Sequence, residues 1–180
     1  MRKRLFIGIE IPSAWQKELA NCCYALDQAD IKCTVPGNIH ITVTFLGNVE
    51  VSDIPSLIDG LRLATNSLTS FDLTFESIIF APPNRPAKMI WALFQYSHDF
   101  KLLVHQMRDA VKAFSSKDDH KNPIPHATLA RIKSSVDTNN INLSQPDFKR
   151  NLSVTSVVLF ESVLLPKHPE YTLLQRFTLQ

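Results

Sequence analysis

One offset of about 86 residues relates two stretches of this sequence and constrains the fold more than any other feature. His40-Ile41-Thr42 recurs as His126-Ala127-Thr128, 86 positions later. The tripeptide Phe75-Glu76-Ser77 recurs as Phe160-Glu161-Ser162 at an offset of 85. Two matches at nearly one offset indicate an internal duplication, with repeats over roughly 1–86 and 87–180.

The residues around both His-x-Thr copies are typical of β-strands, because they are rich in β-branched and apolar side chains. Side chains alternate between the two faces of a strand. His40 and Thr42 therefore share one face, and Ile41, Val43 and Phe45 share the other, so Phe45 is predicted to lie in the core. The second copy alternates in the same way, and both histidine faces are free to meet a ligand.

Each half is predicted to run strand, helix, His-x-Thr strand. The expected strands are Arg4–Ile11, His40–Leu46, Phe71–Phe80, Met89–Gln95, a strand from His126, and a closing hairpin within Ser162–Leu179. The expected helices are Ser13–Ala29 with Ser13 as N-cap, Ile54–Ser67 and His98–Phe114. Residues 134–148 are polar and are expected to form a loop or a short helical turn.

The predicted fold is α+β, with residues 1–180 forming one bilobal domain. Two pseudo-symmetric lobes of antiparallel β-sheet carry helices on the outside, and the active site lies in the central cleft. Equivalent strands of a duplicated unit face each other across a pseudo-two-fold axis. His40 and His126 are therefore expected to meet there despite their separation in sequence.

Composition limits the class of protein and the cellular location that we expect. Apolar content is 44% and charged content 20%, as in ordinary globular proteins. No apolar run reaches the roughly 20 residues needed to cross a bilayer, so neither a membrane span nor a signal peptide is expected. Cys22, Cys23 and Cys33 are an odd, clustered set, which favours a reduced, cytoplasmic location. A net charge of +2 is too small to indicate wholesale polyanion binding.

Two histidines across a cleft suit acid–base chemistry on a phosphodiester, because the unperturbed pKa of imidazole is about 6.5. One neutral ring can accept a proton from water while one protonated ring donates to the leaving oxygen. The hydroxyls of Thr42 and Thr128 can donate hydrogen bonds to phosphate oxygens. No metal or other cofactor is needed. A zinc site on His40 and His126 is disfavoured, since further ligands at suitable spacing are missing.

With these residues in view, the chain resembles the two-histidine phosphoesterase superfamily, most closely the RNA 2′,3′-cyclic phosphodiesterases once called 2′-5′ RNA ligases. The resemblance rests on residues 40–47 and 125–131, and it extends to the opening segment 4–12, the Trp91 strand and the closing hairpin. One departure is visible. Family members often carry a tryptophan shortly before the first motif, whereas Cys33-Thr34-Val35 has none.

The resemblance implies an RNA 2′,3′-cyclic phosphodiesterase that produces 2′-phosphate ends, with weak reverse 2′-5′ ligation. It implies His40 as proton donor and His126 as proton acceptor, although the symmetry of the motifs leaves these roles open from sequence alone. Thr42, Thr128 and Arg131 would bind phosphate. Strict alternation turns Arg131 away from His126, so the strand is expected to end or twist there. The implied partners are RNA ends bearing cyclic phosphate, acted on by a monomer.

Two alternatives stay open. A related enzyme would act on 2′-5′ oligoadenylate or a small cyclic nucleotide. A protein of another class would bind RNA or nucleotides without catalysis, which the two intact His-x-Thr pairs argue against. Trp91 and Phe94 could stack a base, but aromatic residues on a central strand are more often core. His98, His105, His120 and His168 lack a partner motif and are expected to have no catalytic role.

Overall fold

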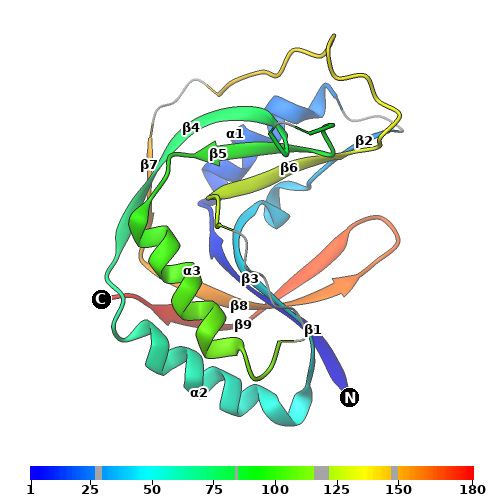
Figure 1. Cartoon of the computed structure of the whole chain (residues 1–180). Helices are drawn as coiled ribbons and strands as arrows, with labels where there is room; N and C mark the ends of the chain where they lie inside the picture. The colour runs from blue at the N-terminus through cyan, green and yellow to red at the C-terminus, as the bar shows by residue number, and fades with distance from the viewer. Residues whose placement is uncertain (27–29, 84, 116–121, 147–149) are drawn as a thin grey trace.

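The strands of this chain form one curled antiparallel sheet with helices packed on it (Figure 1). The computed structural model describes all residues except 27–29, 84, 116–121 and 147–149. The strands are β1 (Arg2–Glu10), β2 (Ile31–Cys33), β3 (His40–Glu50), β4 (Phe71–Ala81), β5 (Met89–Phe94), β6 (His126–Ile132), β7 (Asn151–Val154), β8 (Ser156–Leu164) and β9 (Pro169–Thr178). The helices are α1 (Ser13–Tyr24), α2 (Ile54–Thr65) and α3 (His98–Val111), with 3-10 turns η1 (Pro36–Asn38) and η2 (Val51–Asp53).

The strand order is symmetric about its centre. It runs β7-β4-β5-β6-β3-β1-β8-β9, with β2 paired to the outer part of β6. Exchanging β1 for β5, β3 for β6 and β4 for β8, each about 86 residues away, reverses the six central strands onto themselves, and the end strands β7 and β9 are outside this relation. The internal duplication stays a prediction, and the symmetry supports it. Each lobe combines strands from both halves of the sequence.

The two lobes meet at the β3–β6 pair. Ile41 and Ala127 are the Cα partners that join these strands, and both side chains are fully buried. Beyond this point β3 continues against β1, and β6 continues against β5 and β2. The two motif-bearing strands are therefore direct neighbours in the sheet.

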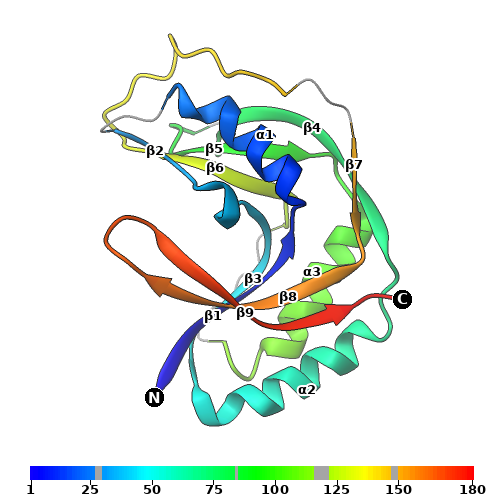
Figure 2. The ribbon, with the colours of Figure 1, turned by 180° about the vertical axis from the view of Figure 1, so that it is seen from behind.

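The helices cover one face of the sheet. α1 packs on β6 and β2, whereas α3 packs on β3 and α2 packs on α3 and β9 (Figures 1 and 2). Apolar residues recur every three or four positions on the buried side of α3, as an amphipathic helix requires. These residues are Phe100, Leu103, Val104, Met107 and Val111. They join Ile41 and Ala127 in the main core, so no helix of the described part of the chain covers the opposite face of β3 and β6, which is called the helix-free face below.

The α+β class, with a curled antiparallel sheet and helices on one side, is confirmed. Among the described residues, no helix has the length and apolar character needed to cross a bilayer. Residues 134–146 contain no helix or strand, in keeping with the predicted loop, and residues 147 and 148 of that loop lie outside the described part.

Several predicted boundaries are wrong. Ser13 is the first helical residue of α1 rather than its N-cap, which is Pro12, and no side chain caps this end. The helix ends at Tyr24, short of the predicted Ala29, which lies outside the described residues. Strand β3 does not stop at Gly47 but continues to Glu50.

Phe45 is not a core residue, and a β-bulge is the reason. Ile7 pairs with Thr44 while Gly8 pairs with Thr42, which leaves Val43 as an extra residue in β3. An extra residue shifts the alternation of everything after it. Phe45 therefore shares the helix-free face with Thr42, and its side chain is 50% exposed.

The backbone conformation of β3 at position 47 favours glycine, because the φ of Gly47 is 82° and lies in the left-handed region. A residue with a Cβ is strained there by about 1–2 kcal/mol. We expect Gly47→Ala to lower the free energy of unfolding in urea by about that amount. Gly37→Ala is the matched control, since a Cβ at Gly37 would meet nothing within 4 Å and should change the stability by less than about 0.5 kcal/mol. Equal stability of both variants would contradict this account of Gly47.

Candidate active site

The single Ile41–Ala127 pair gathers both His-x-Thr motifs on one face of the sheet. His40 and Thr42 flank Ile41, and His126 and Thr128 flank Ala127. Because Ile41 and Ala127 point into the core, the residues on either side of them point to the helix-free face. The pairings of β5 agree, since Trp91 lies opposite Thr128 and Leu93 opposite His126.

The two imidazoles are held in the same way. Nδ1 of His40 lies 2.8 Å from the carbonyl oxygen of Asn38, two residues earlier. Nδ1 of His126 lies 2.8 Å from the carbonyl oxygen of Ile124, also two residues earlier. A carbonyl only accepts hydrogen bonds, so Nδ1 carries the proton in both rings. In the neutral rings Nε2 is therefore unprotonated and able to take a proton.

The threonine contacts differ between the two motifs. The Thr42 hydroxyl lies 3.0 Å from Nε2 of His40, and with Nδ1 protonated it donates to that nitrogen. Within the described part of the chain, Nε2 of His126 has no such bond with Thr128. The two rings are thus held alike at Nδ1 but differ at Nε2, the nitrogen available for proton transfer.

Different aromatic groups surround the two rings. His126 stacks on Trp91 with 3.8 Å between ring centroids and 25° between planes. His40 packs against Phe6 at 4.8 Å and against the edge of Tyr171 at 5.3 Å. A π face stabilises a cation placed over it, most strongly for tryptophan. Trp91 therefore favours positive charge on His126.

Gly8 makes room for His40. A Cβ at Gly8 would lie 3.2 Å from Cδ2 of His40, 3.2 Å from the carbonyl oxygen of Ile41 and 3.4 Å from Cε2 of Phe160. Any side chain at this position would press on the imidazole. The glycine thus leaves room for the imidazole of His40 beside Phe6.

Burial lowers the pKa of both histidines. For His40, desolvation is the main cause, the Asn38 carbonyl acts against it, and positive charge on His126 lowers the pKa further. For His126, desolvation again lowers the pKa and the Ile124 carbonyl opposes the change. The influence of His126 on His40 shows that the two rings share one electrostatic environment. Both rings are neutral at pH 7, and a bound anion would raise the pKa of each.

Arg131 reaches the histidine face through a second bulge. Ile90 pairs with Ala130 while Trp91 pairs with Thr128, which leaves Leu129 as an extra residue in β6. Arg131 then pairs with Met89 and shares the face of Thr128. The strand neither ends nor only twists at this residue, as expected from sequence, but continues to Ile132 with a shifted alternation.

Cations from both lobes lie near Tyr171. Burial raises the pKa of Tyr171, and the positive charges of Arg131 and Arg4 act against that rise. Arg131 belongs to β6 and Arg4 to β1, so these two cations come from different lobes. All five residues assigned to the site from sequence thus lie on one face of the sheet: His40, Thr42, His126, Thr128 and Arg131.

The sequence analysis missed four neighbours of His40, namely Phe6, Gly8, Phe160 and Tyr171, and it misplaced Phe45, which lies beside Phe6. Phe6 and Gly8 lie at alternate positions of β1, so a pairing of β1 with the His40 strand would have placed them correctly. Phe94 is core, as predicted. Trp91 is buried too, at 8% exposed, but it packs against the histidine face rather than within the main core. Among the described residues, no cluster of three or more His, Cys, Asp or Glu side chains could hold a metal.

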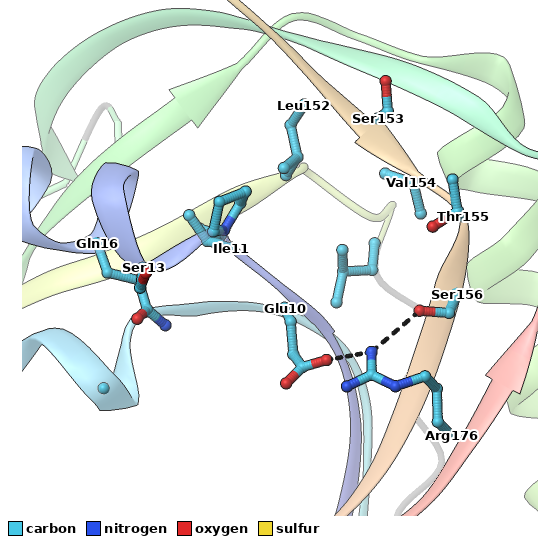
Figure 3. Close-up of a pocket in the computed structure, with 13 residues that line it drawn as sticks. Glu10, Ile11, Ser13, Gln16, Leu152, Ser153, Val154, Thr155, Ser156 and Arg176 are labelled. Atoms are coloured by element: carbon cyan, nitrogen blue, oxygen red, sulfur yellow. Dashed lines mark hydrogen bonds and ion pairs between the residues drawn. The ribbon is translucent and has the colours of Figure 1, made fainter.

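A separate hollow of about 480 Å³ lies at the far end of β1 (Figure 3). An ion pair between Glu10 and Arg176 lines it, and Arg176 also donates to Ser156 at 3.2 Å. None of the five predicted site residues lines this hollow. Its charges are already paired, so we assign the chemistry to the histidine face.

Comparisons with known proteins agree with this geometry. Residues 9–91, which include the first motif, match the family model described as LigT like Phosphoesterase. The RNA 2′,3′-cyclic phosphodiesterase of Methanocaldococcus jannaschii is 22% identical over 178 residues, covering 97% of this chain and 99% of the relative. The enzyme of the same name from Archaeoglobus fulgidus is 24% identical over 184 residues, with the same coverage.

Solved structures share the fold. Escherichia coli LigT complexed with 3′-AMP has a TM-score of 0.82 at 19% identity, covering 99% of each chain. The protein TT0787 of Thermus thermophilus has a TM-score of 0.81 at 23% identity, covering 98% of this chain and 97% of that protein. The resemblance to the two-histidine phosphoesterases that the motifs predict is thus confirmed by the match of residues 9–91 to the LigT-like phosphoesterase model and by relatives and solved structures that match nearly the whole chain.

The lowered histidine pKa values predict acid sensitivity. The unfolded chain takes up protons at an ordinary histidine pKa of about 6.5, above that of the folded rings. The free energy of unfolding should therefore fall as the pH drops below about 6.5, until the folded rings are also protonated. His126→Gln removes one of the two titrating rings and should reduce this loss of unfolding free energy. Urea unfolding at several pH values would measure it. A steeper loss in the variant, or NMR titration giving either ring a pKa above 6.5, would contradict the lowered pKa values.

Proposed function

We propose that this protein hydrolyses RNA 2′,3′-cyclic phosphodiester ends to 2′-phosphomonoesters by metal-independent acid–base catalysis with His40 and His126. The observation that carries the proposal is the Ile41–Ala127 pair, which puts two His-x-Thr motifs side by side on one face. The curated relatives named RNA 2′,3′-cyclic phosphodiesterase, which match nearly the whole chain, support it.

In this mechanism His126 takes a proton from the attacking water. Its Nε2 is unprotonated, because Nδ1 donates to the Ile124 carbonyl. The stacked Trp91 stabilises the imidazolium that forms. This arrangement supports the role of proton acceptor for His126. Each such proton transfer contributes roughly 10²- to 10⁴-fold to the rate.

His40 is then the proton donor to the departing 3′ oxygen. The anionic phosphate raises its pKa, so that Nε2 becomes protonated when substrate binds. Protonation of Nε2 releases the Thr42 hydroxyl proton from its bond to the ring. Thr42, Thr128 and Arg131 then donate to the non-bridging oxygens, where charge grows in the transition state. Attack by the 5′-hydroxyl of a second RNA in place of water, with the same loss of the 3′ oxygen, would give weak 2′-5′ ligation.

Phe45 supports a nucleotide as substrate. It is half exposed on the histidine face, 5.9 Å from the ring of Phe6. An exposed ring beside a phosphate site offers a stacking surface for a base. The substrates we propose are therefore RNA ends with cyclic phosphate, bound by a monomeric enzyme in the cytoplasm. The unbridged cysteines Cys22, Cys23 and Cys33 fit that location.

The test is hydrolysis of an oligonucleotide that ends in 2′,3′-cyclic phosphate. We expect a bell-shaped pH profile, unchanged rates in excess EDTA and a 2′-phosphate product. His40→Ala and His126→Ala should each lower kcat by at least about 10²-fold with the fold intact. His105→Ala on α3, an exposed histidine away from the site, is the matched control and should keep full activity. Full activity in either site variant, or inhibition by EDTA, would refute the mechanism.

Stacking by Phe45 makes a separate prediction. Phe45→Leu keeps an apolar side chain but removes the π face, so KM should rise about tenfold with little change in kcat. Steady-state kinetics on the same oligonucleotide would measure this. Leu63→Ala, which removes an exposed apolar group from α2, should leave KM unchanged. A Phe45→Leu enzyme with normal KM would exclude base stacking at this position.

The alternatives predict other outcomes. An enzyme for 2′-5′ oligoadenylate or a small cyclic nucleotide would turn those substrates over faster than the oligonucleotide. A binding module without catalysis would bind all of them and hydrolyse none. The two Nδ1–carbonyl bonds favour an enzyme, because they fix the ring orientation that proton transfer needs.

A further inference from the structure

Two cations lie side by side at the edge of the histidine face. Lys32 on β2 is the direct cross-strand partner of Arg131 on β6, and both side chains are exposed. The neighbouring pairs Ile31–Ile132 and Cys33–Ala130 have their apolar side chains turned to the core. By alternation, Lys32 shares the face of Arg131 and hence that of Thr128.

Like charges directly opposite each other on a sheet destabilise it. No described carboxylate forms an ion pair with Lys32 or Arg131, although other cations of the chain have such partners. Asp30, two residues before Lys32, pairs with Lys133 instead, since Nζ of Lys133 lies 2.9 Å from Oδ1 of Asp30. The repulsion between Lys32 and Arg131 is thus left for an external anion to relieve.

The position of this pair relative to the histidines indicates which anion fits. Thr128 and Arg131 are three residues apart along β6, a span of about 10 Å for an extended strand and less with the Leu129 bulge. Lys32 lies on β2, one strand further from the histidines than Arg131, so it is too far to bind the reacting phosphate and close enough to bind the next phosphate of an RNA chain. Arg131 lies between Thr128, three residues earlier on β6, and Lys32, its partner on β2.

We propose that Lys32 binds the phosphodiester that precedes the terminal cyclic phosphate, while Arg131 beside it binds the terminal phosphate. This inference rests on the function proposed above and gives it a substrate class, oligonucleotide ends rather than cyclic mononucleotides. A cyclic mononucleotide has no preceding phosphodiester and leaves Lys32 without an anion to bind. Lys32 thus sets specificity without touching the reacting atoms.

The experiment compares three substrates: 2′,3′-cyclic AMP, an ApA dinucleotide that ends in cyclic phosphate, and the same dinucleotide with an uncharged methylphosphonate linkage. Wild type should prefer the charged dinucleotide. Lys32→Gln should lower the ratio of its kcat/KM to that of cyclic AMP by about tenfold, the effect of one charge-assisted contact. In the wild type, the uncharged methylphosphonate linkage should lower the ratio of kcat/KM for the dinucleotide to that for cyclic AMP. In Lys32→Gln, the same change of linkage should have no further effect on this ratio.

Lys133→Gln is the matched control, because it removes the same charge from the same edge of the sheet but from an existing ion pair. It should leave the substrate ratio unchanged. In Lys32→Gln, the dependence of log kcat/KM on log salt for the dinucleotide should become shallower by about 0.7, as for one lost phosphate contact on a single strand. An equal loss on all three substrates, no loss on any, or the same loss in Lys133→Gln would overturn the proposal.

A binding measurement separates this inference from the proposed function. Calorimetry on the wild type and on Lys32→Gln would use 2′-AMP and the dinucleotide with a terminal 2′-phosphate, neither of which needs to react. We expect Lys32→Gln to weaken the dinucleotide about tenfold more than 2′-AMP. If the protein hydrolyses no cyclic phosphate, the proposed function is wrong. The difference in binding between the dinucleotide and 2′-AMP still tests whether Lys32 binds the preceding phosphodiester. Equal weakening of both ligands, or none, overturns it.

Discussion

One antiparallel pair, Ile41 with Ala127, holds the functional face of this protein together. Both side chains are fully buried in the core, which turns their neighbours outward. Because the pair joins β3 to β6, it also joins the two lobes, so the link between the lobes and the positioning of the histidines are the same contact. A change that separated these strands would divide the sheet and the site at once.

The two histidines make equivalent hydrogen bonds at Nδ1 and differ in their other contacts. Both rings donate to the carbonyl two residues earlier, a local contact that any copy of the motif would bring with it. The groups around the rings come from other strands and differ: Trp91 lies flat on His126, whereas Phe6 and Tyr171 surround His40. The motif therefore fixes ring orientation, and the non-equivalent strands around it give the two histidines distinct surroundings.

Much of this arrangement could be predicted from sequence, and the exceptions have one cause. The offset of 86 residues was enough to predict that His40 and His126 would lie together, since equivalent strands meet at a symmetry axis. Strict alternation failed at Phe45 and would have failed at Arg131, because Val43 and Leu129 are extra residues in their strands. Neither is a glycine, and nothing in their side chains marks a bulge. Pairing with β1 and β5 determines these positions, and a single strand cannot reveal it.

The two bulges also have a consequence for how such a gene can change. Removal of the codon for Val43 or Leu129 would delete an ordinary aliphatic residue, yet it would send Phe45 or Arg131 to the opposite side of the sheet. Most substitutions at the same codons would leave those side chains where they are. For this protein, a deletion between a motif histidine and these neighbours should therefore alter the site more than a substitution at the same position.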